Sequence, residues 1–219
     1  MGFKLIFGDN RRRQCFMFIG LLLQIVAYLM TKPDEQSLLS LVSGLSGVFA
    51  VVLCAERKFV YFYFAWVQLF TYIILAYQQK FYGEISENIF YAVTMIVGMF
   101  IWHKHKDLDE DDKVEPEKLS LKDHVFIGIV TIILTYVCYL RLLQSDDTQP
   151  FMDSITTIPA AMAQILMILR FREQWIYWLI IDVASIYMWY VAGNYCMVAQ
   201  FIFWTANCIF GLYNWKSKE

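Results

Sequence analysis

The residues best suited to chemistry lie in one apolar run between Gln174 and Val191. On a helix, Trp175, Trp178 and Asp182 fall on one stripe, because steps of three and seven residues turn by about 300° and 700°. A carboxylate deep in a membrane-spanning run costs roughly 2.5–3.5 kcal/mol on insertion scales. Indole faces attract cations through their quadrupole, and the carboxylate would compensate the same positive charge. The stripe therefore predicts a site for a flat aromatic ring that carries a positive charge.

Amide side chains within the other apolar runs are candidates to complete this site. A buried amide in a membrane protein commonly forms a helix-to-helix hydrogen bond worth about 0.6 kcal/mol, and we assign that role to Gln24 and Gln164. Four further amides stay open between binding and structural roles, because their helices are expected to line a central cavity. They are Gln68, Asn88, Gln200 and Asn207. Trp175 is likewise open between the ligand site and an aromatic belt at the membrane interface.

The composition predicts an all-α polytopic membrane protein. Hydrophobic residues make up 59% of the chain and the mean hydropathy is +0.48, above the roughly 45–50% apolar content of a soluble domain. The net charge of -2 gives no sign of a nucleic-acid partner. The cysteines at positions 15, 54, 138, 196 and 208 have no metal-ligand spacing and are interpreted as small buried hydrophobic residues.

About eight apolar segments approach the length needed to cross about 30 Å of hydrocarbon. They run approximately over Phe16–Met30, Leu38–Cys54, Phe59–Tyr77, Ile85–Trp102, Val125–Leu143, Ser154–Leu169, Gln174–Val191 and Cys196–Trp215. With a cytoplasmic N-terminus, 15 of the 18 Lys and Arg residues fall on the cytoplasmic side, and only Lys32, Lys80 and Arg141 fall outside. The positive-inside rule then predicts that both termini are cytoplasmic.

The chain also matches itself weakly at a shift of 113 residues. The matched pairs include Arg57 and Arg170, Gly98 and Gly211, and Trp102 and Trp215. Two groups of three helices share this register, and the additional span between them gives both groups the same orientation. The predicted order is one leading helix followed by a 3+1+3 parallel repeat, a transporter architecture with its substrate site near the midplane between the halves.

The predicted organisation has four parts. Residues 1–37 form an N-terminal cytoplasmic segment and the extra helix, and residues 38–102 form the first three-helix bundle. Residues 103–153 form a cytoplasmic linker and connecting helix, and residues 154–219 form the second three-helix bundle. The linker from His103 to His124 is rich in acidic residues and lysines, so it is expected to be solvated.

Nothing in the sequence indicates an enzyme, a metal site or a cofactor. The chain has no HExxH, no phosphate-binding glycine loop and no GxSxG motif. We also expect no paired carboxylates inside the membrane, which leaves Asp182 as the single deep carboxylate. A proton-coupled symporter that titrates Asp182 is therefore disfavoured but stays an alternative, as does a non-transporting scaffold.

Several motifs together resemble the PnuC family of bacterial vitamin transporters, whose best-known members carry nicotinamide riboside. The most specific is W-x-x-W-x-x-x-[N/D], and the others are Tyr82-Gly83-Glu84, Asn88-x-x-Tyr91 and the Gly-x-x-x-Trp endings at Gly98/Trp102 and Gly211/Trp215. The resemblance covers Leu38 to Trp215. It implies a fold related to the SWEET sugar transporters, facilitated diffusion without an ion gradient in the bacterial cytoplasmic (inner) membrane, and self-association. It also implies that a cytoplasmic kinase traps the vitamin by phosphorylation.

The predicted function is uptake of nicotinamide riboside. Trp175 and Trp178 would pack on the ring, with Asp182 near the positive charge or the ribose hydroxyls. Gln68, Asn88 and Asn207 would supply hydrogen bonds, and Tyr91 joins the site through its motif. Many riboside carriers have Asn where this chain has Asp182, so the cargo stays open towards thiamine, another flat cation, and towards riboflavin or a nucleoside.

Overall fold

The computed structural model describes residues 11–30, 35–107 and 113–215. Within these ranges the chain forms eight helices and one small antiparallel hairpin of strands β1 (Lys106–Asp107) and β2 (Lys113–Val114). The helices are α2 (Arg11–Met30), α3 (Glu35–Ala55), α4 (Tyr61–Gln79), α5 (Tyr82–Lys104), α6 (Leu121–Leu142), α7 (Pro150–Ile168), α8 (Gln174–Val191) and α9 (Tyr195–Asn214). Each helix corresponds to one predicted segment, with ends within five residues of the prediction.

Six of the eight helices are long and apolar enough to cross a membrane, and the two that fall short are α4 and α8. Both have adequate lengths of 19 and 18 residues. Their composition is the reason for the shortfall, since α4 contains Gln68 and ends in Gln78-Gln79, and α8 contains Asp182 together with several tyrosines and tryptophans. Both helices thus carry polar or amphipathic residues of the predicted site within their apolar runs.

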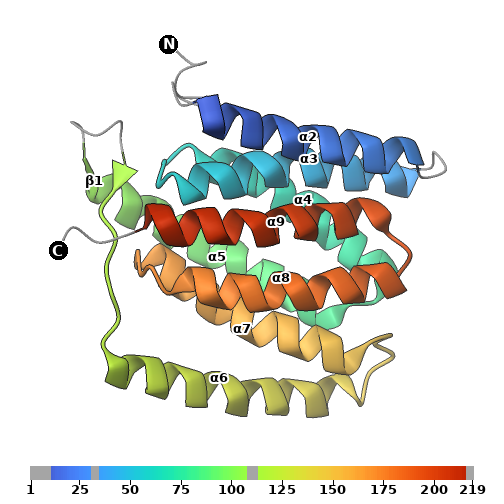
Figure 1. Cartoon of the computed structure of the whole chain (residues 1–219). Helices are drawn as coiled ribbons and strands as arrows, with labels where there is room; N and C mark the ends of the chain where they lie inside the picture. The colour runs from blue at the N-terminus through green and yellow to red at the C-terminus, as the bar shows by residue number, and fades with distance from the viewer. Residues whose placement is uncertain (1–10, 31–34, 108–112, 216–219) are drawn as a thin grey trace.

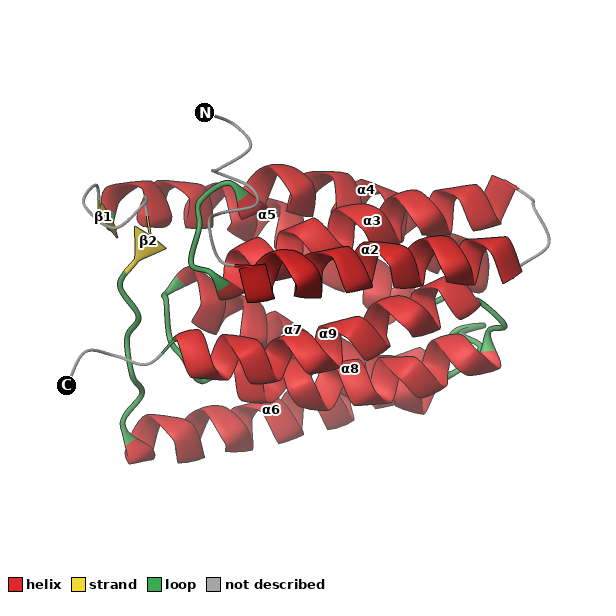
Figure 2. Ribbon diagram, turned by 45° about the horizontal axis from the view of Figure 1, so that its top comes forward, coloured by secondary structure: helices red, strands yellow, loops and turns green. Residues whose placement is uncertain are grey.

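The helices run alternately up and down in one bundle (Figure 1). Helix α9 packs against α2, α3 and α8, and α5 packs against α4 and α7. Helix α6 lies at the edge of the bundle and packs mainly on α7 (Figure 2). Its outer face is apolar, with Phe126 68% exposed and Ile132 71% exposed, as expected for a helix that faces lipid.

Two tryptophans each join the C-terminal ends of two helices. Their two contacts are equivalent, since one becomes the other at a shift of 113 residues. The Trp102 indole N–H donates to the Met167 carbonyl at 3.3 Å, and the Trp215 indole N–H donates to the Cys54 carbonyl at 3.2 Å. Both indoles are fully buried. Each tryptophan thus satisfies a carbonyl near the end of a helix from the other part of the chain.

The segment 113–119, which we call the strap, crosses the turns after α3 and α7. Val114 N–H donates to the Arg57 carbonyl at 3.2 Å, and Glu117 N–H donates to the Arg170 carbonyl at 2.7 Å. The two arginines, both with left-handed φ of 61° and 65°, donate back to the carbonyls of Val114 and Glu115 at 2.9 and 3.0 Å. This part of the linker is therefore paired rather than solvated, contrary to the prediction, and Val114 is fully buried.

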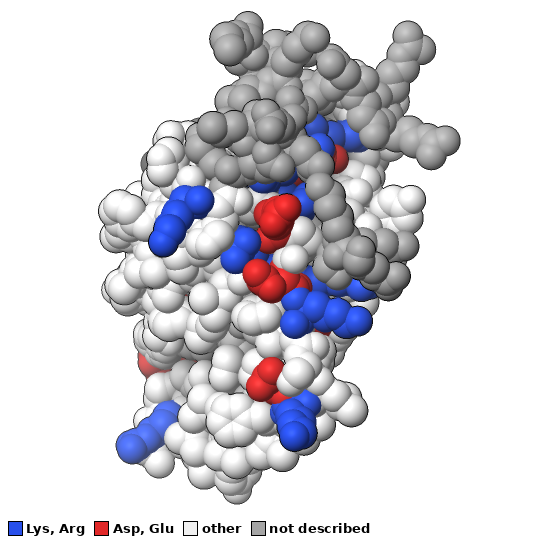
Figure 3. All heavy atoms as spheres, turned by 90° about the vertical axis from the view of Figure 1, so that its left-hand side faces the viewer, with Lys and Arg blue, Asp and Glu red and all other residues white. Residues whose placement is uncertain are grey.

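Charged side chains gather at the end of the bundle where the strap lies (Figure 3). They include Arg57, Lys58, Lys113, Glu117, Arg170 and Arg172. The acidic run 108–112 and the N-terminal segment before residue 11 lie outside the described residues. Of the five free cysteines, Cys54, Cys196 and Cys208 are buried as predicted. The prediction is wrong for Cys15, which is exposed, and for Cys138, which is half-buried, because both lie on outer helix faces.

Candidate functional site

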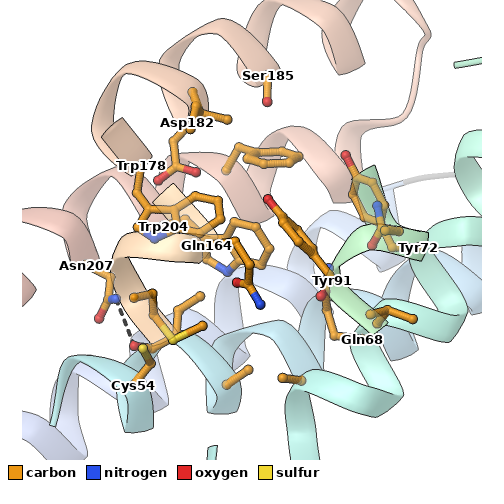
Figure 4. Close-up of a pocket in the computed structure, with 18 of the residues that line it drawn as sticks. Cys54, Gln68, Tyr72, Tyr91, Gln164, Trp178, Asp182, Ser185, Trp204 and Asn207 are labelled. Carbon is orange, nitrogen blue, oxygen red and sulfur yellow. Dashed lines mark hydrogen bonds between the residues drawn. The ribbon is translucent and has the colours of Figure 1, made fainter. Parts of the chain in front are cut away.

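A pocket of about 140 Å³ lies among helices α3, α4, α5, α7, α8 and α9 (Figure 4). Helices α2 and α6 contribute no residue to its lining. All seven residues predicted for the site line it, namely Gln68, Asn88, Tyr91, Trp175, Trp178, Asp182 and Asn207. An apolar cavity of about 150 Å³ holds benzene in another protein, so this pocket has room for an aromatic ring.

Aromatic side chains from three helices form the walls of the pocket. Trp178 of α8 and Tyr91 of α5 meet edge to face, with ring centroids 6.1 Å apart, and Trp204 of α9 lines the same space. Trp175 is only 3% exposed, so the alternative of a lipid-facing belt residue is wrong. Its indole lies against Gly211, where an added Cβ would come within 2.4 Å of the ring.

Asp182 lies in the middle of α8 and is 2% exposed. Its Oδ2 accepts a hydrogen bond from the Cys208 thiol at 3.2 Å. Among the described residues that line the pocket, none is Lys, Arg or His. A thiol is a weak donor, so most of the hydrogen-bonding capacity of this carboxylate remains available to a ligand.

Three predicted amides line the pocket, and Asn207 keeps a free acceptor there. Asn207 donates from Nδ2 to the Val51 carbonyl at 3.0 Å, while its Oδ1 has no partner among the described residues. Asn88 donates from Nδ2 to the Glu84 carbonyl one turn earlier in α5 at 2.8 Å. Gln68 of α4 is half-buried at the pocket wall.

Gln164 and Gln200 differ from the prediction in whether they line the pocket. Gln164 donates to the Thr94 hydroxyl at 3.3 Å, which confirms the predicted helix-to-helix bond, but it also lines the pocket. Gln200 is fully buried yet lies outside the pocket lining, because its side chain faces Gly47 of α3. Gln200 is therefore removed from the candidate site.

Two carboxylates that were not predicted for the site join Asp182 at the pocket. Glu84 and Glu87 of α5 are 3% and 7% exposed and both line the pocket. Their spacing of three residues places them on one helix face, and Glu87 lies one turn before Tyr91. Glu87 could have been noticed in the sequence, because it lies inside the predicted apolar segment Ile85–Trp102. It was not chosen because it is close to the start of that segment, where a charged residue is common.

A buried polar network surrounds the first turn of α5. Asp153 of α7 accepts hydrogen bonds from the N–H groups of Gly83 and Glu84 at 2.7 and 2.9 Å, so it caps the helix N-terminus. Glu84 accepts from the hydroxyls of Tyr72 and Thr156 at 2.8 and 2.7 Å. Both oxygens of Glu84 are thus engaged by the protein.

Comparison with known proteins identifies the family. The family model described as nicotinamide mononucleotide transporter matches residues 37–217. A relative from Haemophilus influenzae named nicotinamide riboside transporter PnuC is 32% identical over 91% of this chain and 87% of its own length. The chain belongs to the PnuC family of membrane transporters. Neisseria mucosa PnuC, also named a nicotinamide riboside transporter, is 28% identical over 91% of this chain and 78% of its own length.

A solved PnuC structure has the same fold. The crystal structure of a protein described as the vitamin B3 transporter PnuC superposes with a TM-score of 0.84 at 26% identity, and the match covers 97% of this chain and 94% of that chain. Residues 37–217, which match the family model described as nicotinamide mononucleotide transporter, include every residue that lines the pocket. The chain is thus a membrane transporter and not an enzyme, as predicted.

Proposed function

We propose that this PnuC family member takes up nicotinamide riboside, the cargo named for its relatives from Haemophilus influenzae and Neisseria mucosa. The observation that carries the proposal is the pocket itself, which Trp178 and Tyr91 line together with Asp182. The riboside has a flat pyridinium ring with one positive charge. Aromatic faces stabilise such a cation by about 0.5–2 kcal/mol, and Asp182 supplies the compensating charge.

The lining also favours the riboside over the mononucleotide named in the family description. Among the described lining residues, Glu84, Glu87 and Asp182 are acidic and no basic residue is present. A phosphate group needs Arg, Lys or several backbone N–H donors to replace its water. Carboxylates near it would instead repel its negative charge.

The contacts that recur at a shift of 113 residues support the 3+1+3 repeat as the working architecture. Under this proposal α3–α5 and α7–α9 are parallel halves, α6 restores the orientation, and α2 is the extra helix. All eight helices would span the cytoplasmic membrane of a bacterium, with both termini in the cytoplasm. The pocket would open alternately to either side as the halves rock against each other.

We infer that transport needs no ion gradient and that a cytoplasmic kinase traps the riboside by adding a phosphate that the acidic pocket rejects. The same chemistry accommodates thiamine, which also has a flat cationic ring, so thiamine is the alternative cargo. Self-association of the protein in the membrane remains a further expectation.

Titration of the intrinsic tryptophan emission separates these cargoes in the purified protein. Trp178 and Trp204 line the pocket, so a bound pyridinium should quench their emission. We expect saturable quenching with nicotinamide riboside, much weaker quenching with thiamine, and none with the mononucleotide. Tighter binding of thiamine would reverse the assignment, and equal weak responses to all three would exclude each of them.

A further inference from the structure

Glu87 is the acidic residue of the pocket that the protein itself leaves least satisfied. Its side chain is 7% exposed, and its Oε2 has no hydrogen-bond partner among the described residues. Glu84 differs, since Tyr72 and Thr156 occupy its two oxygens. Buried polar atoms in folded proteins nearly always have a partner, because an unpaired one loses its hydration without compensation. A free carboxylate oxygen at the wall of a ligand pocket therefore points to a ligand group.

Glu87 also has a defined place relative to the proposed ring site. It precedes Tyr91 by one turn of α5, or about 6 Å along the helix axis. Tyr91 contacts the Trp178 ring of α8. Asp182 follows Trp178 by one turn of α8, so Glu87 and Asp182 reach the pocket from two different helices. A cargo ring beside Trp178 and Asp182 would extend its substituent towards α5.

The hydroxyl group of Tyr91 adds a second free polar atom on this wall. It too has no hydrogen-bond partner among the described residues. Figure 4 shows the hydroxyl end of Tyr91 pointing across the pocket towards the side where Asp182 and Ser185 lie. Glu87 and Tyr91 thus face each other without a hydrogen bond of normal geometry, so they offer adjacent acceptor and donor atoms to a ligand.

We propose that Glu87, assisted by Tyr91, is the subsite for the sugar hydroxyls of the cargo and so determines specificity for a riboside. The inference rests on the proposed function. An ionised carboxylate is acceptor-only and offers two oxygens, which match the two O–H donors of a vicinal diol. The sugar is attached at the ring nitrogen, so a ring held beside Trp178 and Asp182 places the diol on the α5 wall. Hydrogen bonds to a charged acceptor are short and about twice as strong as neutral ones.

The test compares two ligands on one substitution, Glu87→Gln. Nicotinamide riboside has the ring, the charge and the sugar, whereas 1-methylnicotinamide has the same ring and charge without the sugar. Binding of both is measured by tryptophan quenching on the full-length protein. We expect Glu87→Gln to weaken riboside binding by roughly 10- to 100-fold, as for loss of a hydrogen bond to a charged group, and to leave 1-methylnicotinamide binding unchanged. Glu115→Gln, at an exposed strap position, is the matched control and should change neither.

A sugar variant gives an independent readout. A riboside that lacks the 2′-hydroxyl should bind the wild-type protein more weakly than the full riboside, and this difference should disappear in Glu87→Gln. If Glu87→Gln does not fold, Glu87→Asp keeps the charge but withdraws it by one methylene, and it should weaken the riboside selectively. Failure of the wild-type protein to bind riboside would reject the proposed function rather than the subsite.

Three outcomes would overturn the inference while the proposed function stands. Equal weakening of riboside and 1-methylnicotinamide would place Glu87 at the ring cation instead of the sugar. Unchanged binding of both ligands would remove Glu87 from the cargo site. The affinity lost on removing the 2′-hydroxyl could also be the same in the wild-type protein and in Glu87→Gln. That result would mean that another residue binds the diol.

Discussion

At the residue scale, Asp182 combines deep burial with little internal compensation. Among the described residues its carboxylate accepts one hydrogen bond, which comes from a thiol, and no basic residue is among the described pocket residues. Burial of a charge without a partner is unfavourable. Such an arrangement is common at functional sites, where stability is lower than the fold would otherwise allow.

Asp182→Ala should therefore separate binding from stability, because it removes the carboxylate without supplying the Asn side chain that many riboside carriers have at this position. We expect riboside affinity to fall by at least about 30-fold, because removal of one partner of a buried charge pair costs roughly 2–5 kcal/mol. The melting temperature of the ligand-free protein in detergent should stay the same or rise. Asp146→Ala, at an exposed loop residue paired with Lys80, is the control. An unchanged riboside affinity would remove Asp182 from the site.

Gly211→Ala tests the close approach of α9 to Trp175. The new Cβ would lie 2.4 Å from the indole, so the ring has to move. We expect a destabilisation of about 1–3 kcal/mol together with weaker riboside binding, measured by thermal melting and tryptophan quenching. Gly128→Ala on α6 is the control, because nothing lies within 4 Å of its added Cβ, and a similar loss there would show that the contact with Trp175 is not the cause.

At the element scale, the strap connects the turns that end α3 and α7. Its hydrogen bonds to Arg57 and Arg170 are backbone-to-backbone and side-chain-to-backbone. Arg170 also pairs with Glu117 at 3.3 Å. One short segment thus contacts both halves of the proposed repeat at the same end of the bundle.

Arg170→Ala should loosen one attachment of the strap and leave the other in place. We expect faster amide hydrogen exchange at Glu117, whose N–H is bonded to the carbonyl of residue 170, with little change at Val114. Arg57→Ala should show the opposite pattern. Equal acceleration at both amides in either variant would mean that the strap opens as a single unit.

At the scale of the whole molecule, uptake of a cation without a coupled ion moves net charge. An inside-negative potential of 100 mV is worth about 2.3 kcal/mol per elementary charge, which corresponds to roughly 50-fold accumulation at equilibrium. We expect this accumulation in proteoliposomes with a potassium diffusion potential.

A pH gradient without a membrane potential should have no such effect on uptake. This control is needed because the pocket contains Glu84 and Glu87 as well as Asp182. Proton coupling was disfavoured on the expectation of a single carboxylate, and that expectation no longer applies to the pocket. Accumulation driven by the pH gradient alone would show that protons are coupled to transport.

Much of the fold follows from local patterns in the chain. Helix number and approximate ends depend on apolar runs and their charged borders, and a backbone in lipid has few alternatives to the helix. The tryptophan motif, Asp182 and the amides were visible for the same reason, since a polar residue inside an apolar run stands out wherever the run lies in space.

The tertiary structure decided which polar residues share one space. Glu87 lies near a helix start in the sequence, and only the packing of the helices shows that it lines the pocket. Gln200 lies against α3 and outside the pocket lining. The strap was unpredictable for a similar reason, because its partners lie more than fifty residues away on either side. Burial and pairing are properties of contacts between distant segments, so no run of neighbouring residues encodes them.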